Sequence, residues 1–280
     1  MMRSSSVLEL TTFDKEFTMT STASPISREV RGHVFLIGLN RVDKKNAFNL
    51  AMLRELSAAI GEYEANPELR AAVLFTHGED FTAGLDLMDV APAMAGDAGI
   101  VEEGAFDPVG VHGKTRTKPL VCAVQGLCLT LGIELMLASD IVVAGDDTRM
   151  AQIEIKRGIF PFGGANQRWV AASGWGNAMR YLLTGDELDA ATAYRIGMVQ
   201  EVVSPDQVLS RALELANTIA AQAPLGVAAT LRSARIGVEE GQQAAFQHLV
   251  PEIHKLMVTE DAREGVMSFM QRRAAQFKGR

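Results

Sequence analysis

Cysteine is nearly absent from this sequence of 280 residues, which contains only Cys122 and Cys128. Two cysteines are too few for a disulfide framework, and their spacing does not match that of a zinc site. Both lie in the apolar run 119–132, where a free cysteine usually behaves as a small buried hydrophobic residue. We therefore expect two reduced thiols in the core and a cytoplasmic protein, because disulfides are rare in that compartment.

Positive charge is also scarce. The 27 lysine and arginine residues are outnumbered by 34 aspartate and glutamate residues, so the formal net charge is −7. This balance argues against general nucleic-acid binding, which favours a basic surface. It does not exclude a phosphorylated ligand, since a local cationic patch is enough to hold one.

Long hydrophobic runs are missing as well. No apolar run reaches the roughly 18 residues that a membrane-spanning helix needs, so no membrane segment is expected. Residues 1–25 lack the apolar region of a signal peptide and are rich in serine and threonine, which predicts a flexible N-terminal extension. The whole chain is 48% hydrophobic and 22% charged, a composition typical of a globular protein with a large core.

From residue 33 onward the pattern alternates between strands and helices, which predicts an α/β fold. The segment 49–64 has apolar residues on one helical face: Leu50, Leu53, Leu56 and Ile60. The other expected helices are 131–140, 177–185 and 188–197, and the expected strands are 33–40, 71–78, 119–126, 141–145 and 198–203.

Residues 91–118 interrupt this alternation with glycine, proline and small residues that show no sustained periodicity. Part of the segment, around 97–103, is expected to be helical. A loop of this length in a compact domain is often a binding loop or a lid, and the alternative is a loose surface excursion.

After residue 205 the pattern is wholly helical. Pro205 lies near a helix start, Pro251 predicts a kink or break, and Asp261 with Glu264 is expected to form a capping box. The expected organisation is a flexible extension at 1–25, a core at 26–204 and a helical region at 205–280.

Two glutamates stand in apolar surroundings. Glu134 lies in the run LTLGIELML, and Glu154 lies between two isoleucines. A carboxylate that is charged, buried and unpaired costs several kcal/mol. Low polarity and mutual repulsion also separate the proton affinities of two carboxyls, so that one donates a proton while the other accepts one. The alternative is that each glutamate pairs with an arginine, such as Arg157 or Arg168.

Acid–base chemistry at a carbonyl also needs donors for the negative charge that develops on oxygen. Backbone N–H groups at turns and helix starts provide them. Two segments qualify, the turn at 81–87 and the turn at 127–132, which precedes the helix expected to carry Glu134. Each signal is weak alone, since a glycine at the end of a strand usually marks only a turn.

Two other enzyme classes find little support. No G-x-S-x-G motif is present, so a serine hydrolase is not expected. No G-x-G-x-x-G motif opens a helix, so a Rossmann dinucleotide site is not expected either. The histidines are scattered along the chain: His33, His77, His112, His248 and His254.

Six segments carry a series of motifs in a fixed order. They are RVDKKNAFNLAMLREL (41–56), GEDFTAGLDLMDV (78–90), KPLVCAVQGLCLTLGIELMLASDIVVAG (118–145), IEIKRGIFPFGGANQR (153–168), TGDELDAATAYRIGMVQEVV (184–203) and EGVMSFMQRR (264–273). Together they resemble the motifs of the crotonase superfamily, whose founding activity is that of enoyl-CoA hydratase. The resemblance extends from about residue 28 to the C-terminus.

This resemblance implies an α/β fold built as a spiral of ββα units, with a C-terminal helical region that assembles homotrimers or dimers of trimers. It implies an acyl-CoA thioester substrate and a hydratase that adds water across the C2=C3 bond of an enoyl-CoA or removes it. Glu134 and Glu154 fall on the two catalytic glutamates of hydratases, and the N–H groups of Leu85 and Leu131 on the oxyanion donors. No metal or redox cofactor is implied. Which glutamate is the base stays open, because the pair would titrate together.

The resemblance also assigns residues to the CoA moiety. Lysines near the start of the first helix and in the tail of a neighbouring subunit are candidates for the CoA phosphates, the alternative being solvated surface lysines. The turn at 83–86 lines the path of adenine and pantetheine, and a tail phenylalanine packs near the ligand of a neighbouring subunit. The residues concerned are Lys44, Lys45, Ala83, Gly84, Asp86, Phe277 and Lys278.

The chain departs from the family pattern in two segments. Where the family usually has three glycines, this chain has Thr130, Leu131 and Gly132, and a left-handed conformation at Leu131 would be strained. Phe162, which precedes Gly163 in the substrate-binding segment, stands where a glycine near the catalytic water is common. Both side chains add bulk to the acyl pocket. This leaves open an isomerase or hydrolase of a specialised acyl-CoA, or a catalytically silent CoA-binding scaffold.

Overall fold

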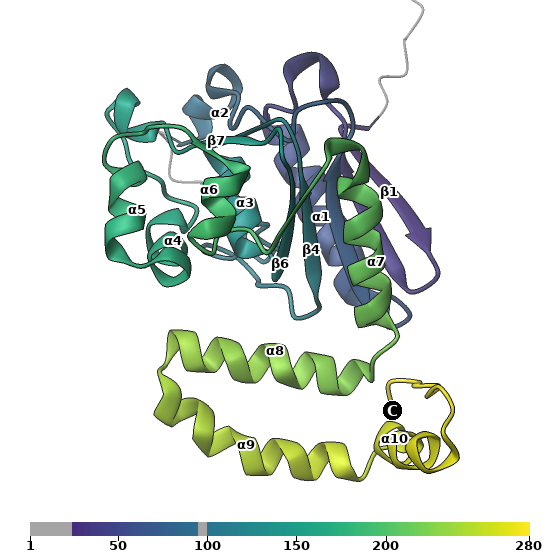
Figure 1. Ribbon diagram of the computed structural model, residues 1–280. Helices are drawn as coiled ribbons and strands as arrows, with labels where there is room; N and C mark the ends of the chain where they lie inside the picture. The colour runs from purple at the N-terminus through teal and green to yellow at the C-terminus, as the bar shows by residue number, and fades with distance from the viewer. Residues whose placement is uncertain (1–23, 95–99) are drawn as a thin grey trace, which may run out of the picture.

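A six-stranded sheet lies at the centre of the molecule (Figure 1). The computed structural model describes residues 24–94 and 100–280. Strand β1 is antiparallel to β2, and all later neighbours are parallel. In spatial order the strands are β1 (Ile26–Arg31), β2 (Val34–Leu39), β3 (Ala71–Thr76), β4 (Leu120–Val124), β6 (Ile141–Gly145) and β9 (Glu201–Val203). The predicted α/β fold is confirmed.

The central strands are apolar on both faces because the sheet is covered on both sides. Every residue of β2 is buried. Val34 and Leu36 belong to one core cluster, and Phe35 and Ile37 belong to another, as the two-residue period of a strand requires. A strand buried on both faces appears in the sequence as a continuous apolar run, and such runs predicted these strands correctly.

Two long helices belong to the two clusters on opposite sides of the sheet. Helix α1 (Leu50–Ala65) contributes Leu56 and other apolar residues to the core cluster that contains Phe35 of β2. Helix α7 (Val208–Ala220) contributes alanines to the cluster that contains Val34. Asn49 caps α1, since its side-chain oxygen accepts the N–H of Met52 at 2.9 Å. The amphipathic helix predicted at 49–64 is confirmed.

A second, three-stranded sheet in the order β5-β7-β8 positions the two glutamates. Strand β5 leads into the helix that carries Glu134, and β7 leads into the short 3-10 helix that begins with Glu154. Since β5 and β7 are parallel neighbours, the segments that follow them leave the sheet at the same edge. The elements are β5 (Leu127–Leu129), α3 (Leu131–Ala138), β7 (Arg149–Ala151), η2 (Glu154–Arg157) and β8 (Leu188–Asp189).

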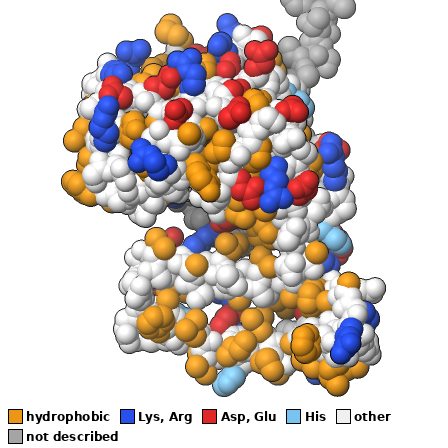
Figure 2. Space-filling view, viewed as in Figure 1, with side chains coloured by type: hydrophobic (Ala, Val, Ile, Leu, Met, Phe, Trp, Pro, Cys, Tyr) orange, Lys and Arg blue, Asp and Glu red, His pale blue; other side chains and the backbone are white. Residues whose placement is uncertain are grey.

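The last three helices stand apart from the sheet in Figure 1. Large apolar side chains on them remain exposed, among them Phe246, Phe269 and Met270, and Figure 2 shows hydrophobic atoms gathered on this part of the surface. No helix within 24–94 or 100–280 is long and apolar enough to cross a membrane. The remaining helices are η1 (Val42–Lys44), α2 (Leu87–Met94), α4 (Ala165–Ser173), α5 (Trp175–Leu182), α6 (Ala190–Arg195), η3 (Pro205–Gln207), α8 (Pro224–Glu239), α9 (Gln242–Met257) and α10 (Glu260–Gln271).

The irregular segment begins later than the sequence suggests, because α2 includes residues 91–94. Of the helical stretch expected at 97–103, residues 97–99 lie outside the described residues, and 100–103 form bends and turns rather than a helix. The extension expected at 1–25 lies outside the described residues up to position 23.

The C-terminal helices bear on two of the predictions. Helix α9 continues through Pro251, which excludes the predicted break and leaves the alternative of a kink. The capping box expected from Asp261 and Glu264 is wrong, because Thr259 caps α10 by accepting the N–H of Ala262 at 3.0 Å. The Asp261 carboxylate is engaged elsewhere, since it accepts backbone N–H groups of the C-terminal tail.

Asn46 ties the segment before α1 to the loop that carries Leu85. Its side chain is buried and its φ is 52°, in the left-handed region that asparagine tolerates. The Asn46 backbone oxygen accepts the hydroxyl of Thr82 at 2.7 Å. The side-chain amide nitrogen of Asn46 donates to Thr76 Oγ1 (2.6 Å), His77 O (3.1 Å) and Asp80 O (2.9 Å). Its side-chain oxygen accepts the backbone N–H of Arg41 (2.7 Å).

Replacement of Asn46 by alanine should lower the free energy of unfolding by about 2–4 kcal/mol, because it leaves buried backbone groups unsatisfied and places alanine at positive φ. Urea denaturation followed by circular dichroism measures the change. Asn177→Ala is the matched control, since that exposed amide makes only a local bond to Ser173 O. It should change stability by less than about 0.5 kcal/mol. Equal losses in the two variants would contradict this role for Asn46.

Candidate active site

Glu134 is a buried carboxylate in the first turn of α3. Its Oε1 accepts the backbone N–H of Gly163 at 2.6 Å. A Cβ atom at Gly163 would overlap the Glu134 carboxylate, so only glycine permits this close approach. The hydrogen bond fixes one carboxylate oxygen of Glu134 at the wall of a pocket.

Glu154 begins η2 and is 7% exposed. Its Oε1 accepts a hydrogen bond of 3.3 Å from the side-chain amide of Gln152, which is fully buried. Its Oε2 is buried without a hydrogen-bond partner in the described part of the chain. A buried carboxylate oxygen without a partner is costly, and such atoms point to a functional site.

The two glutamates line the same pocket, which has a volume of about 220 Å³. Elements from four regions of the sequence meet there: the turn before α2, the start of α3, η2 and the segment after it. Apart from the carboxyls and Arg157 the lining is mostly apolar. The lining residues are Ala83, Leu85, Leu87, Thr130, Leu131, Glu134, Ile153, Glu154, Arg157, Ile159 and Phe162.

Burial raises the pKa of both carboxyl groups. Loss of solvation is the largest cause, and it brings the pKa of Glu134 to about 7 and that of Glu154 to about 7. For Glu134, the hydrogen bond from Gly163 acts in the opposite direction, and the nearby charge of Glu154 raises the pKa further. Near neutral pH these carboxyls are therefore suited to donate or accept a proton.

The alternative pairing of the glutamates with arginines is not found among the described residues. Glu134 is bonded to a backbone amide and Glu154 to a glutamine instead. The guanidinium of Arg168 donates to the carbonyl of Gly163 at 3.2 Å, and its charge is the smallest of the influences on Glu134. Arg157 lines the pocket without an ion pair to either carboxyl.

Two residues that line the pocket, Leu85 and Leu131, have backbone amides without internal partners in the part of the chain that the structure describes. Leu131 is the first residue of α3, so its N–H has no acceptor within the helix. Leu85 forms a single bridge with Phe48, which uses the N–H groups of Phe48 and Asp86 rather than that of Leu85. Within the described residues neither the Leu85 N–H nor the Leu131 N–H has an acceptor.

The backbone strain lies at Thr130 and not at Leu131. Thr130 has φ 49° and ψ −109°, a conformation that costs a β-branched residue about 1–3 kcal/mol. Leu131 is helical, so the strain considered for it is absent. Gly84, with φ 94°, lies against the Thr130 hydroxyl, and a Cβ atom there would overlap it. The two loops that carry the free amides are therefore in direct contact.

The turn at 83–86, predicted to line the path of adenine and pantetheine, contributes Ala83 and Leu85 to the pocket. The carbonyl of Gly84 accepts the N–H of Phe48 at 2.8 Å. The Asp86 carboxylate does not face the pocket but accepts a hydrogen bond of 2.9 Å from Arg41. Phe162 also lines the pocket, directly before Gly163.

The charged and tail candidates for CoA lie outside this pocket within one chain. Lys44 and Lys45 are exposed at the turn before α1, and Lys45 Nζ lies 3.2 Å from Asp80. Phe277 lines a groove between α7 and α8, and Lys278 lies beside it in the tail. Neither tail residue lines the glutamate pocket of its own chain.

The sequence analysis missed several residues of the pocket. Gln152 is a fully buried polar side chain. Its place in the sequence, as a polar residue in an apolar segment at the end of a strand, could have indicated its importance. Leu87, Ile153 and Ile159 line the pocket as well. An apolar residue beside a cavity has the same sequence signature as one in the core, so these three gave no signal.

The fold and the pocket together bring two buried carboxyls and two unpaired backbone amides into one region of the described chain. Comparisons with known proteins give the family. The family described as "Enoyl-CoA hydratase/isomerase" matches residues 29–280. The chain belongs to this family, and it is an enzyme of the enoyl-CoA hydratase/isomerase type.

Relatives match over nearly their whole length. "Enoyl-CoA hydratase EchA19" of Mycobacterium tuberculosis is 34% identical over 256 residues, which cover 90% of this chain and 96% of that protein. "2,3-dehydroadipyl-CoA hydratase" of Escherichia coli is 32% identical, with 91% and 98% covered. The crystal structure of a probable enoyl-CoA hydratase/isomerase from Mycobacterium abscessus is 51% identical, with a TM-score of 0.89 and coverage of 91% and 99%. These matches confirm the crotonase-type fold.

The raised pKa values predict a stability change with pH. A carboxyl whose pKa rises on folding binds more protons in the folded state between its ordinary pKa of 4.5 and about 7. Its contribution to stability is therefore present below pH 4.5 and is lost as the pH rises to about 7. The double variant Glu134→Gln/Glu154→Gln lacks these groups and should lose less stability over this interval.

The measurement is the free energy of unfolding from urea titrations of both proteins across this range. The difference between variant and wild type should grow in favour of the variant up to about pH 7 and then level off. Glu187→Gln is the control, because that exposed carboxylate pairs with Arg149. A difference that stays constant with pH would show that the two buried carboxyls titrate normally.

Proposed function

We propose that this protein catalyses the reversible syn addition of water across the C2=C3 bond of an enoyl-CoA thioester, with Glu134 and Glu154 as acid and base. The observation that supports it most directly is that one apolar pocket is lined by two buried glutamates and by two residues whose backbone amides have no partner in the described chain. The relatives named as enoyl-CoA hydratases agree with this reaction.

The thioester oxygen is proposed to accept hydrogen bonds from the N–H groups of Leu85 and Leu131. When water adds to C3 of the conjugated thioester, negative charge moves to this oxygen as an enolate. Two preorganised N–H donors in an apolar pocket stabilise that charge, and removing one such donor typically costs roughly 100- to 1000-fold in rate. This places C2 and C3 of the substrate beside the two carboxyls.

The carboxyl pair then handles the protons. The ionised glutamate removes a proton from the water molecule while the oxygen of that water bonds to C3. The protonated glutamate delivers a proton to C2. In total, one O–H unit is added at C3 and one hydrogen at C2. Similar pKa values near 7 allow one carboxyl to be ionised while the other is protonated. Either assignment of acid and base fits, because the two groups titrate as a coupled pair.

Binding of CoA is proposed to use the turn formed by Ala83, Gly84 and Asp86 and the adjacent Phe162 and Gly163. The phosphates would meet the lysines of the turn before α1. Since the tail residues lie away from the pocket in their own chain, the tail of a neighbouring subunit is proposed to supply a phenylalanine and a lysine. The residues concerned are Lys44, Lys45, Phe277 and Lys278.

The proposed assembly is a homotrimer or a dimer of trimers built on the helical region 205–280, whose exposed apolar side chains would be covered there. The family is generally independent of cofactors, and hydration exchanges no electrons, so the reaction is proposed to need only the CoA ester and water. Two free, buried cysteines agree with a cytoplasmic protein.

Loss of the conjugated thioester absorbance of crotonyl-CoA and longer enoyl-CoAs tests the reaction. Glu134→Gln and Glu154→Gln should each lower kcat by about 100- to 10,000-fold, the usual contribution of an acid or base. Glu187→Gln, on the surface, should leave kcat unchanged.

Binding of saturated butyryl-CoA, followed by calorimetry, separates catalysis from binding and should persist in both variants. Binding without hydration by the wild type would indicate a silent CoA-binding scaffold. Turnover of a different thioester without hydration would indicate an isomerase or hydrolase. Either result contradicts the proposed hydratase.

A further inference from the structure

A second pocket of about 270 Å³ lies between α1 and the segment 100–109. Its interior is aliphatic and aromatic, with Leu53, Leu56, Ala58, Phe106, Val109 and Leu135 among its lining. Its polar groups are engaged: the hydroxyl of Ser57 donates to the carbonyl of Phe106 at 2.6 Å. The chemistry of this pocket fits a hydrocarbon chain.

The outer rim of the second pocket is polar. Arg54 and Glu102 line it and form an ion pair of 2.9 Å between α1 and the segment opposite. Both side chains are well exposed, so the pair lies at the surface. On the side of α3 the lining of the second pocket consists of Leu131 and Leu135, which are both buried.

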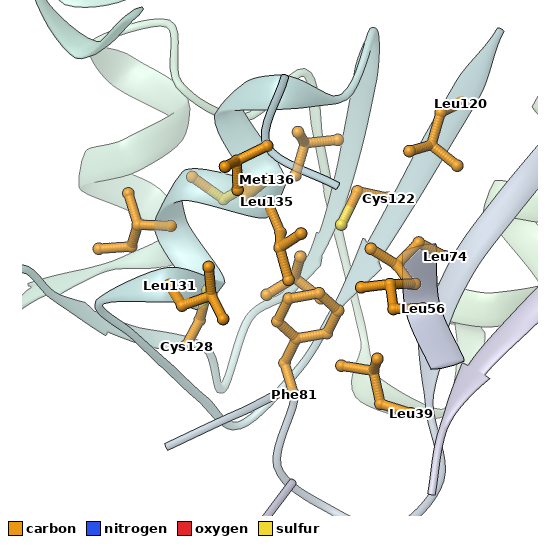
Figure 3. Packing of buried hydrophobic residues seen from close by; sticks show 14 of the residues in the cluster. Leu39, Leu56, Leu74, Phe81, Leu120, Cys122, Cys128, Leu131, Leu135 and Met136 are labelled. Atoms are coloured by element: carbon orange, nitrogen blue, oxygen red, sulfur yellow. The ribbon is translucent and has the colours of Figure 1, made fainter. Parts of the chain in front are cut away.

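Leu131 is the only described residue that lines both pockets. Its side chain is 6% exposed and belongs to the same core cluster as Leu56 and Leu135, and Figure 3 shows Leu131 and Leu135 projecting from α3 in this cluster. Its backbone N–H is also a proposed donor to the thioester oxygen. An acyl chain attached to that thioester therefore begins beside the Leu131 side chain.

We propose that the Leu131 side chain is the wall that limits acyl-chain length in this enzyme, and that the pocket behind it accepts an aliphatic chain once the wall is removed. This inference rests on the proposed hydratase function. The substrate class it assigns is short-chain enoyl-CoA, whose acyl group ends within the glutamate pocket. The backbone amide of Leu131 keeps its role whatever side chain it carries.

The test compares kcat/KM for trans-2-enoyl-CoAs of four, eight and twelve carbons. Wild type should prefer the four-carbon ester. Leu131→Ala should raise the ratio of eight-carbon to four-carbon kcat/KM by at least about tenfold, since even one further methylene in an apolar pocket is worth that much. Leu131→Val, which removes less of the side chain, should raise this ratio by a smaller factor.

Leu135→Ala is the matched control, because Leu135 is equally buried on the same helix and lines only the second pocket. It should leave the ratio unchanged. Gly61→Leu refills the second pocket, since a Cβ at Gly61 meets only the ring of Phe106, at 3.5 Å. Added to Leu131→Ala, it should abolish the gain with the eight-carbon ester.

The proposal is overturned if wild type hydrates the eight-carbon ester as well as the four-carbon one, if Leu131→Ala leaves the ratio unchanged, or if Gly61→Leu fails to reverse the gain. Calorimetry with saturated butyryl-CoA and octanoyl-CoA gives an answer that does not need turnover. Leu131→Ala should bind octanoyl-CoA at least about tenfold more tightly than wild type does. If no hydration is seen but Leu131→Ala binds octanoyl-CoA more tightly than wild type does, the proposed hydratase activity is rejected. The proposal that Leu131 limits chain length then stands.

Discussion

The burial of two carboxyl groups in one apolar pocket is the constraint on which the rest of this structure depends. Glu134 and Glu154 each lose solvation, and the fold compensates only in part, with one backbone N–H and one glutamine amide. A protein that needed only stability would gain by replacing them with apolar residues. Their presence in this pocket fits the proposed proton transfer, for which carboxyls with pKa values near neutrality are suited.

The same arrangement is the basis of the proposed position of the substrate's carbonyl and chain. Thr130 carries backbone strain directly before α3, whose first residue, Leu131, has a free amide in the described chain. Gly84 allows the loop of Leu85 to pack directly against Thr130. The Leu131 side chain lines both pockets. In the proposed mechanism, one residue therefore links charge stabilisation, through its backbone, to chain-length selection, through its side chain.

The sequence predicted the elements with strong periodicity and missed those shaped by tertiary contacts. The strands of the sheet and the helix at 49–64 were found because apolar patterns mark them directly. Strand β1, which has mostly exposed residues, has no such pattern. The two glutamates were identified as unusual because they stand in apolar segments. The sequence could not show that the Glu134 carboxylate accepts a hydrogen bond from Gly163, since this contact depends on the tertiary fold. The strain at Thr130 was not predicted, and a left-handed conformation was considered only for Leu131, because backbone angles in a turn depend on both flanking elements.

A crystal structure with acetoacetyl-CoA, a CoA thioester whose enolate resembles the proposed charged intermediate, tests the central claim most directly. The account predicts that the thioester oxygen lies about 2.7–3.1 Å from the backbone nitrogens of both Leu85 and Leu131. It also predicts that the carboxyls of Glu134 and Glu154 face the acyl carbons C2 and C3 of the same molecule. A thioester oxygen bound away from these amides, or acyl carbons out of reach of either carboxyl, would contradict it.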